Sequence, residues 1–531
     1  MRTPTIELSV LSLLLAPSLA HGQATTAAEP IDDEGRPAPA AERFEPRLDE
    51  WWQDSVFYEV FVRSFADSTT GPLANDGVGD LRGLIERLDY LNDGDPTTDD
   101  DLGVTALWLM PITESPSYHG YDTTDYRRVE PDYGTNEDFR DLIKACRERG
   151  IRVTIDLVLN HCSRAHPWFE AAASGDPDKR DWFIWSDEDP GYRGPWNQPV
   201  WHRADGSYFY GCFWQGMPDL NYENPDVTRE MLDVVRFWLE DMGADGFRMD
   251  AIRHLIEDGP RQDNTPATHA WLQQYYACVK NINPEAFSVG EIWAPSNDVS
   301  RYVGDQMDLA FEFSLSDAIL TTVNTRDASP LRKAMTTVNE LYPTGMYATF
   351  LRNHDQSRTM HVLGGDVEAA KLAASIQFAL PGVPFMYYGE EIGMSADKPD
   401  PQLRTPMQWE SGPNVGFSSA EPWIEPKADA ESVNVASESS DPDSLLSHYR
   451  DLIRERQSDA ALRKGELRFL ETRDPRVLAF TRTYRDDRTL CLFNLAEEPV
   501  STSIRTDDDE QDDTAFQLAP RSARYLRSAA P

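Results

Sequence analysis

Eight short runs rich in β-branched and aromatic residues, separated by longer stretches with helical periodicity, constrain the fold of this chain most strongly. The runs begin near residues 55, 104, 152, 246, 287, 309, 347 and 383. Stretches such as 136–150 and 227–243 lie between them and carry apolar residues at i, i+3 and i+4, the spacing of one helix face. Strands that alternate with helices in this way predict an α/β fold, a (β/α)8 or TIM barrel.

The connection after the third run is too long for an ordinary loop. It spans residues 162–222, whereas loops in such units usually have about 2–6 residues. We therefore expect a small inserted domain between the third strand and the helix that precedes the fourth. Its tryptophans can either stack on sugar rings or form the core of a loop-rich module. They are Trp168, Trp182, Trp185, Trp196, Trp201 and Trp214.

The two ends of the chain differ from the barrel. Arg2, an apolar run over residues 8–20 and the small residues that follow predict a secretory signal peptide over 1–24, and hence export. Residues 25–50 lack an apolar period and predict a disordered acidic linker. The predicted barrel then occupies 51–161 and 223–465, on either side of the insertion. Alternating runs after a helix at 444–457 predict an antiparallel β domain over 466–531.

The charge balance excludes some partners. Ninety-one acidic and fifty basic residues give a formal charge of −41, which repels nucleic acid and anionic lipid. No segment after the signal peptide has 18 uncharged apolar residues in a row, so we expect no membrane span and a secreted monomer. Only eight of the basic residues are lysine, which favours a salt-adapted, halophilic protein over an ordinary acidic secreted enzyme.

The cysteines indicate neither a zinc site nor a disulfide scaffold, because their number is odd and they lack CxxC spacing. We mainly expect isolated buried thiols, and the alternative is one disulfide bridge between Cys162 and Cys212. The five are Cys146, Cys162, Cys212, Cys278 and Cys491.

Polar residues gather where several predicted strands end, and barrel enzymes build their active sites there. A single strand-end aspartate is usually a helix cap, but carboxylates at the ends of three separate strands indicate catalysis. These three are Asp250, Glu291 and Asp355, and they are accompanied by Asp156, Asn160, His161, Arg248 and His354.

Two carboxyl groups about 5–5.5 Å apart, one ionised and one protonated, are what retaining glycoside hydrolysis requires. We expect Arg248, two positions from Asp250 and on the same side of the strand, to keep Asp250 ionised by charge pairing. Glu291, near other carboxylates and the apolar Trp293, should hold its proton to higher pH.

Seven segments in order resemble glycoside hydrolase family 13, the α-amylase family, and the resemblance runs from about residue 51 to the C-terminus. Within the family it resembles the group intermediate between oligo-1,6-glucosidases and neopullulanases. The segments are "HGYDTTDY" (119–126), "DLVLNH" (156–161), "MPDLN" (217–221), "GFRMDAIRH" (246–254), "GEIW" (290–293), "RNHDQSR" (352–358) and "RTPMQW" (404–409).

The resemblance implies a role for each matching residue. Asp250 would be the nucleophile, Glu291 the general acid/base, and Asp355 the carboxylate that binds and distorts the sugar before the cleavage point. The flanking residues would bind substrate. Arg248, His161 and His354 would hydrogen-bond the nucleophile or that sugar, Tyr121 would stack under it beside His119, and Arg253 and His254 would contact sugars past the cleavage point.

The resemblance also implies a structural calcium ion. Asn160 and Asp219 match its ligand positions, together with a backbone carbonyl near His254. The acidic first loop is a second candidate, because Asp67, Asp76 and Asp80 offer oxygen ligands for a hard cation. Extra residues after Asp67 alter that loop, and a glycine-rich turn with solvated carboxylates is the alternative.

We therefore expect a secreted retaining α-amylase that hydrolyses α-1,4 bonds of an α-glucan such as starch or maltooligosaccharides. The alternatives on the same scaffold are an exo-acting α-glucosidase, an oligo-1,6-glucosidase or a transglycosylase similar to trehalose synthase. Exo-acting relatives resemble one another in an aspartate just before "GYD", where this chain has Tyr118 and His119. Ala251 is small where α-1,6-specific relatives carry valine. A non-catalytic relative should lack a carboxylate or carry a membrane anchor.

Overall fold

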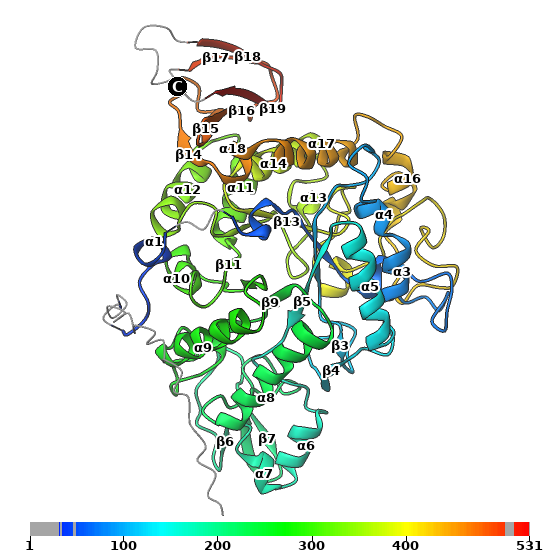
Figure 1. Cartoon of the computed structure of the whole chain (residues 1–531), viewed down its shortest axis with the longest axis vertical. Coiled ribbons are helices and arrows are strands. Elements are labelled where there is room, and N and C mark those ends of the chain that lie inside the picture. The colour runs from blue at the N-terminus through cyan, green and yellow to red at the C-terminus, as the bar shows by residue number, and fades with distance from the viewer. Residues whose placement is uncertain (1–30, 32–33, 46–48, 505–513, 530–531) are drawn as a thin grey trace, which may run out of the picture.

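The computed structural model describes residues 31, 34–45, 49–504 and 514–529 (Figure 1). Eight parallel strands form its central sheet, and an isolated bridge between Phe311 and Ala348 closes the sheet into a barrel. The predicted TIM barrel is therefore confirmed. Around the barrel the strands are β1 (Phe57–Val60), β2 (Ala106–Leu109), β5 (Arg152–Leu157), β9 (Gly246–Met249), β10 (Phe287–Gly290), β11 (Leu309–Ala310), β12 (Ala348–Thr349) and β13 (Val383–Tyr387).

The barrel strands are almost entirely buried, because helices cover their outer face and side chains fill the interior. Aromatic rings from several strands meet inside. Phe57 and Phe385 stack with their centroids 4.3 Å apart, and Phe287 lies 5.0 Å from Phe57. Replacing one such phenylalanine by alanine would lower the free energy of unfolding by about 3–5 kcal/mol. These rings therefore stabilise the barrel, and the polar groups lie on its rim.

Helices return the chain from each strand to the next. α5 (Asn136–Glu148) begins at Thr135, whose hydroxyl and the carboxylate of Asp138 form a reciprocal capping box. α8 (Pro225–Arg236) begins with proline after the cap Asn224 and continues as a π-helical turn, Phe237–Asp241. The other longer helices are α9 (Pro266–Ile282), α11 (Phe313–Thr325), α12 (Ser329–Leu341), α14 (Val367–Ala379) and α17 (Leu445–Ser458).

Short elements fill the loops. They are α2 (Val62–Phe65), α3 (Leu81–Glu86), α4 (Leu88–Leu91), β3 (Thr113–Glu114), β4 (Asp125–Val129), α10 (Ser296–Val299), α13 (Thr359–Val362), α15 (Asp400–Leu403), α16 (Val435–Glu438) and α18 (Ala460–Lys464).

The insertion after β5 forms a small module below the barrel in Figure 1. Most of its tryptophans are structural, as Trp168 and Trp182 show by packing edge to face at 4.8 Å. Trp196 and Trp214 differ, with 62% and 48% of their surfaces exposed. The module contains α6 (Pro167–Ala173), α7 (Pro177–Arg180), β6 (Trp185–Ser186), β7 (Trp201–Ala204) and β8 (Ser207–Tyr210).

A C-terminal antiparallel β domain lies at the top of Figure 1, as the sequence predicted. It has its own apolar core, which includes Val477, Leu492 and Ile504. Its main sheet is built from β14 (Glu466–Phe469), β15 (Val477–Tyr484), β16 (Asp487–Asn494) and β19 (Ser522–Ala529), and β17 (Val500–Ile504) pairs with β18 (Thr514–Leu518).

The N-terminal segment corrects one expectation. Residues 34–45, predicted as part of a disordered linker, pack on the barrel and include the short helix α1 (Ala40–Arg43). Ala40 is fully buried, and Arg43 forms an ion pair of 2.7 Å with Asp305. Partners distant in the sequence hold this segment, which local composition does not reveal. The predicted signal peptide over 1–24 lies outside the described residues.

The cysteines form no disulfide, and all five lie within the described residues. Burial raises the pKa values of the Cys162 and Cys212 thiols, so both are unreactive at neutral pH. Within the described ranges, no helix has the length and apolar character needed to cross a membrane.

Candidate active site

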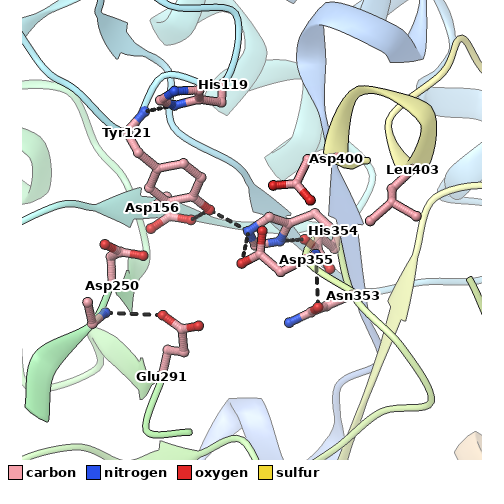
Figure 2. Close-up of polar contacts among 12 residues, drawn as sticks. His119, Tyr121, Asp156, Asp250, Glu291, Asn353, His354, Asp355, Asp400 and Leu403 are labelled. Atoms are coloured by element: carbon pink, nitrogen blue, oxygen red, sulfur yellow. Dashed lines mark hydrogen bonds and ion pairs between the residues drawn. The ribbon is translucent and has the colours of Figure 1, made fainter. Parts of the chain in front are cut away.

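Arg248 is the centre of the polar cluster at the carboxyl ends of the strands. Its side chain is 1% exposed, and Nη1 lies 2.7 Å from Asp250 Oδ1 and 2.8 Å from Asp156 Oδ1. Nη2 lies 2.9 Å from Oε2 of Glu291, which follows β10. One guanidinium therefore contacts both carboxyl groups expected to act as nucleophile and acid. Figure 2 shows Asp250 and Glu291 side by side on the rim.

Burial dominates the electrostatics of these two carboxyl groups. It raises the pKa of Asp250 to about 6, although Arg248 acts in the opposite direction. Charge pairing with Arg248 therefore offsets only part of the desolvation of this carboxyl group. Asp250 is still mostly ionised at neutral pH. Burial also raises the pKa of Glu291, opposed by Arg248 and reinforced by Asp250 and Asp355. Trp293 is 53% exposed and stacks on Phe313 at 4.8 Å.

Asp355 is in a different environment, since two cationic side chains flank it. Arg404 Nη2 lies 2.7 Å from Oδ1, and His354 Nε2 lies 3.2 Å from Oδ2. His354 and Arg404 hold the pKa of Asp355 well below its usual range despite burial. The third carboxylate is therefore ionised throughout the physiological range, as a residue that binds sugar hydroxyl groups requires.

Tyr121 links the parts of this cluster. Its hydroxyl lies 2.7 Å from His354 Nε2 and donates to Asp156 Oδ2 at 3.1 Å (Figure 2). The ring of His119 is stacked with that of Tyr121 at 6.1 Å, and its Nδ1 accepts from the Tyr121 backbone N–H. The expected pair of His119 and Tyr121 thus lies beside the three carboxyl groups.

His161 lies in the cluster but makes a different contact from the one expected. Its Nε2 is 3.1 Å from the backbone carbonyl of Tyr121 rather than from the nucleophile. Burial lowers the pKa of His161 to about 3, so the ring is neutral and Nε2–H donates to that carbonyl. In this structure His161 orients the Tyr121 loop.

Arg253 and His254 are also held by protein partners. Arg253 contacts the carboxylate of Asp263 and the carbonyl of Trp293. His254 Nδ1 donates to the carbonyl of Gln262 at 2.8 Å, and burial lowers the His254 pKa to about 4. That both residues contact sugars past the cleavage point stays a prediction. In the structure they position the rim on which the exposed rings of Trp196 and Trp293 lie, since Trp196 is 5.8 Å from the His254 ring.

The predicted calcium ligands Asn160 and Asp219 come together in the structure. Asn160 Nδ2 donates to Asp219 Oδ2 at 3.0 Å, and both residues are buried. The carboxyl group of Glu257, which sequence reasoning missed, is within hydrogen-bonding distance of Asp219. Asn160 Oδ1 and Glu257 Oε1 are enclosed without a hydrogen-bond partner. Hard oxygen atoms without donors fit the ligand preference of Ca²⁺.

The first loop does not resemble a metal site. Asp67 accepts from the backbone N–H groups of Asn75 and Gly77, and Asp80 accepts from those of Ser68 and Gly83. Asp76 accepts from Val78 in an exposed turn. The expected convergence of Asp67, Asp76 and Asp80 on one cation is therefore not seen, because the folded loop itself satisfies these carboxylates. No group of three or more His, Cys, Asp or Glu side chains in the described ranges is arranged to hold a metal.

Sequence reasoning missed two further residues that contact the cluster. Arg404 lies in the quoted "RTPMQW" segment, but its pairing with Asp355 depends on a loop that follows β13. Glu59 lies inside the apolar run of β1, where a single charged residue flanked by "VFY" and "VFV" was the available signal. Its Oε1 is 2.5 Å from His354 Nδ1.

Comparison with known proteins agrees with this geometry. Residues 59–465 match the profile of the α-amylase catalytic domain, and residues 467–518 match the C-terminal domain of maltogenic amylases. Alpha-amylase 3 of Dictyoglomus thermophilum is 39% identical over 452 residues, covering 84% of this chain and 85% of that relative. A trehalose synthase of Pimelobacter sp. is 35% identical over 529 residues, covering 86% of this chain and 89% of that relative.

Among solved structures, the crystal structure of an α-amylase from H. orenii has a TM-score of 0.81 at 36% sequence identity. The alignment covers 89% of this chain and 99% of that chain. The catalytic profile spans most of the sequence, and the relatives align over nearly their whole lengths. The chain therefore belongs to the α-amylase family of glycoside hydrolases, family 13, and is an enzyme of that family.

Proposed function

We propose that this enzyme is a secreted, monomeric α-amylase that hydrolyses α-1,4 bonds of starch and maltooligosaccharides with retention of configuration. The observation that carries the proposal is the shared guanidinium: Asp250 and Glu291 contact the same Arg248 and lie beside an ionised Asp355. Retaining chemistry needs two carboxyl groups held close together with different protonation.

In the proposed first step, an Asp250 carboxylate oxygen attacks the anomeric carbon while the glycosidic bond breaks. The proton of Glu291 passes to the departing oxygen, which leaves as a sugar hydroxyl group. In the second step, Glu291 takes a proton from water, and the resulting hydroxide displaces Asp250 from the anomeric carbon. The starting charges of both carboxyl groups are restored, and two inversions give net retention.

The residues at Tyr118 and His119, where exo-acting relatives capture the terminal sugar, support cleavage within a glucan chain. The aspartate that captures the terminal sugar in exo-acting relatives is replaced here by Tyr118 and His119. The Tyr118 ring stacks on Trp423 at 5.5 Å and lies 5.8 Å from the Arg404 guanidinium. On the opposite side, the exposed rings of Trp196 and Trp293 would stack against sugars past the cleavage point.

A second candidate is transglycosylation on short oligosaccharides, favoured by the 35% identity to a trehalose synthase. The products formed from starch and from maltose distinguish hydrolysis from transglycosylation. Incubation with soluble starch should give α-configured maltooligosaccharides, with iodine staining falling early relative to the reducing ends released. Incubation with maltose separates the alternatives: trehalose as the main product supports isomerising transfer. Glucose as the sole early product from starch, or isomaltose cleaved faster than maltotriose, supports an α-glucosidase.

We also propose one structural calcium ion, confined to the cluster of Asn160, Asp219 and Glu257. Enclosed oxygen atoms without donors support the site, namely Asn160 Oδ1 and Glu257 Oε1. The cluster lies next to His161 and at the junction of the inserted module with the barrel, where His161 and Asp219 form an isolated β bridge. A cation held there would stabilise that junction and supply no chemistry to the reaction.

A further inference from the structure

A buried carboxylate lies behind the active site, where the proposed mechanism does not use it. Glu59 belongs to β1, and only 2% of its side chain is exposed. A carboxylate in such a position is costly unless it is paired and hydrogen-bonded. Its partner is His354, whose Nδ1 lies 2.5 Å from Glu59 Oε1.

His354 has an acceptor on each side of its ring. Nδ1 faces Glu59, and Nε2 lies 3.2 Å from Oδ2 of Asp355, which Arg404 helps to keep ionised. An ionised carboxylate accepts hydrogen bonds and cannot donate one. A neutral imidazole carries only one N–H, so it can satisfy one of these carboxylates and must turn a lone pair towards the other. When both carboxyl groups are ionised, the geometry requires a doubly protonated ring; burial raises the pKa of Glu59, and a cation on His354 acts in the opposite direction.

The charges around the ring lead to the same conclusion. His354 is faced by the following groups: Glu59 from β1, Tyr121 from the loop after β2, Asp156 from β5, Arg248 from β9, Asp355 from its own loop, Arg404 from the loop after β13, and the edge of Trp108. This set contains three carboxylates, Glu59, Asp156 and Asp355, and Arg248 and Arg404 supply only two cations. A charged His354 is the third.

We propose that Glu59 is a positioning residue: by accepting from Nδ1 it keeps His354 doubly protonated, so that Nε2–H always faces the Tyr121 hydroxyl oxygen and the carboxylate of Asp355. The flanking acids raise the pKa of His354 to about 9 despite burial, which agrees with this arrangement. The inference concerns the family's shared active site and does not depend on which α-glucan is cleaved.

Glu59→Gln tests the proposal, because it keeps the shape and an acceptor atom but removes the charge. Without that charge His354 should lose its proton at lower pH, and its lone pair would then face Asp355. We expect kcat/KM to stay within about threefold of wild type at pH 6 and to fall by at least about tenfold at pH 8.5, mainly through KM. The measurement is a pH profile on both maltotriose and p-nitrophenyl α-glucoside.

Glu312→Gln is the matched control. Glu312 is another buried glutamate, 1% exposed, which accepts from Ser296 and Tyr342 and does not touch His354. Its pH profile should follow that of wild type. Glu59→Gln should also add little in a His354→Asn background, since coupled residues are non-additive. A pH-independent loss in Glu59→Gln, or full additivity with His354→Asn, would overturn the proposal.

The wild-type protein provides a test that needs neither turnover nor a folded Glu59 variant. Nuclear magnetic resonance of histidine-labelled enzyme, with His354→Asn used for assignment, reports the charge of each ring. We expect one histidine to stay charged up to about pH 9. Titration of His354 near its ordinary value of about 6.5 would refute the proposal even if both substrates are cleaved as expected.

Discussion

Two clusters of buried carboxyl groups lie close together in this enzyme, and they are neutralised in different ways. In the catalytic cluster, the guanidinium of Arg248 contacts Asp156, Asp250 and Glu291. In the cluster of Asn160, Asp219 and Glu257, neither carboxyl group forms an ion pair with an Arg, Lys or His side chain in the described part of the chain.

We propose that this difference separates a cluster that transfers protons from one that holds a cation. A fixed internal cation lets one carboxyl group stay ionised while its neighbour keeps a proton, which acid–base chemistry requires. Acidic oxygens without an internal cation must share protons or bind an ion from solution. Substitutions that change the charge of Arg248 or its partners should therefore affect the first cluster, whereas removal of free metal should affect the second.

The largest effect should come from neutralising the catalytic pair. Asp250→Asn and Glu291→Gln should each lower kcat by at least about 10³-fold, because an amide can act neither as nucleophile nor as proton donor. The melting temperature should hold or rise, since the raised pKa of Asp250 shows that folding disfavours its charge at this site. Asp258→Asn, in an exposed turn, is the control. Near-wild-type turnover in purified Asp250→Asn would contradict the assignment.

The next largest effect should come from removing the internal cation, Arg248. Arg248→Leu leaves three buried carboxyl groups without their cation, at a cost of about 3–5 kcal/mol, and should lower the melting temperature clearly. Adding Asp250→Asn to that variant should restore part of the loss, because one buried charge is removed. If the double variant melts below Arg248→Leu alone, charge compensation is not the role of this arginine.

Chelation should act on the second cluster alone. A ligand that binds only the folded state at about 100 times its Kd contributes about 2.7 kcal/mol, so excess EDTA should lower the melting temperature. Glu257→Gln should lose most of this EDTA-sensitive part, whereas Asp76→Asn in the first loop should keep it. An EDTA-insensitive melting curve together with elemental analysis that finds no metal would remove calcium from this site.

The smallest effect should be that of salt on the melting temperature, and it should not depend on either cluster. At about 1 M salt the Debye length is roughly 3 Å, against about 10 Å at 0.1 M, so repulsion among the surface carboxylates behind the −41 charge is screened. The melting temperature should rise up to molar NaCl by a similar amount in wild type and Glu257→Gln. A flat or falling curve in wild type would argue against salt adaptation.

Local patterns were sufficient to predict the barrel and the rim residues. Alternating runs identify the strands, and the alternation of side chains along β9 places Arg248 and Asp250 on one side. The partners of these residues could not be predicted in the same way. Glu59 meets His354 across 295 positions of sequence, and Glu257 meets Asp219 only after the inserted module folds back onto the barrel. The ion pair of Arg253 with Asp263 is likewise a tertiary contact that the sequence pattern did not reveal.

The packing of residues 34–45 on the barrel has a consequence for where the folding unit begins. The family match starts at residue 59, yet Arg301 donates to the carbonyl of Pro37 at 2.7 Å, and Phe44 covers Gly304 so closely that a side chain there would collide with its ring. A chain shortened to the matched region would uncover this patch. The family match alone therefore understates the length of the folding unit.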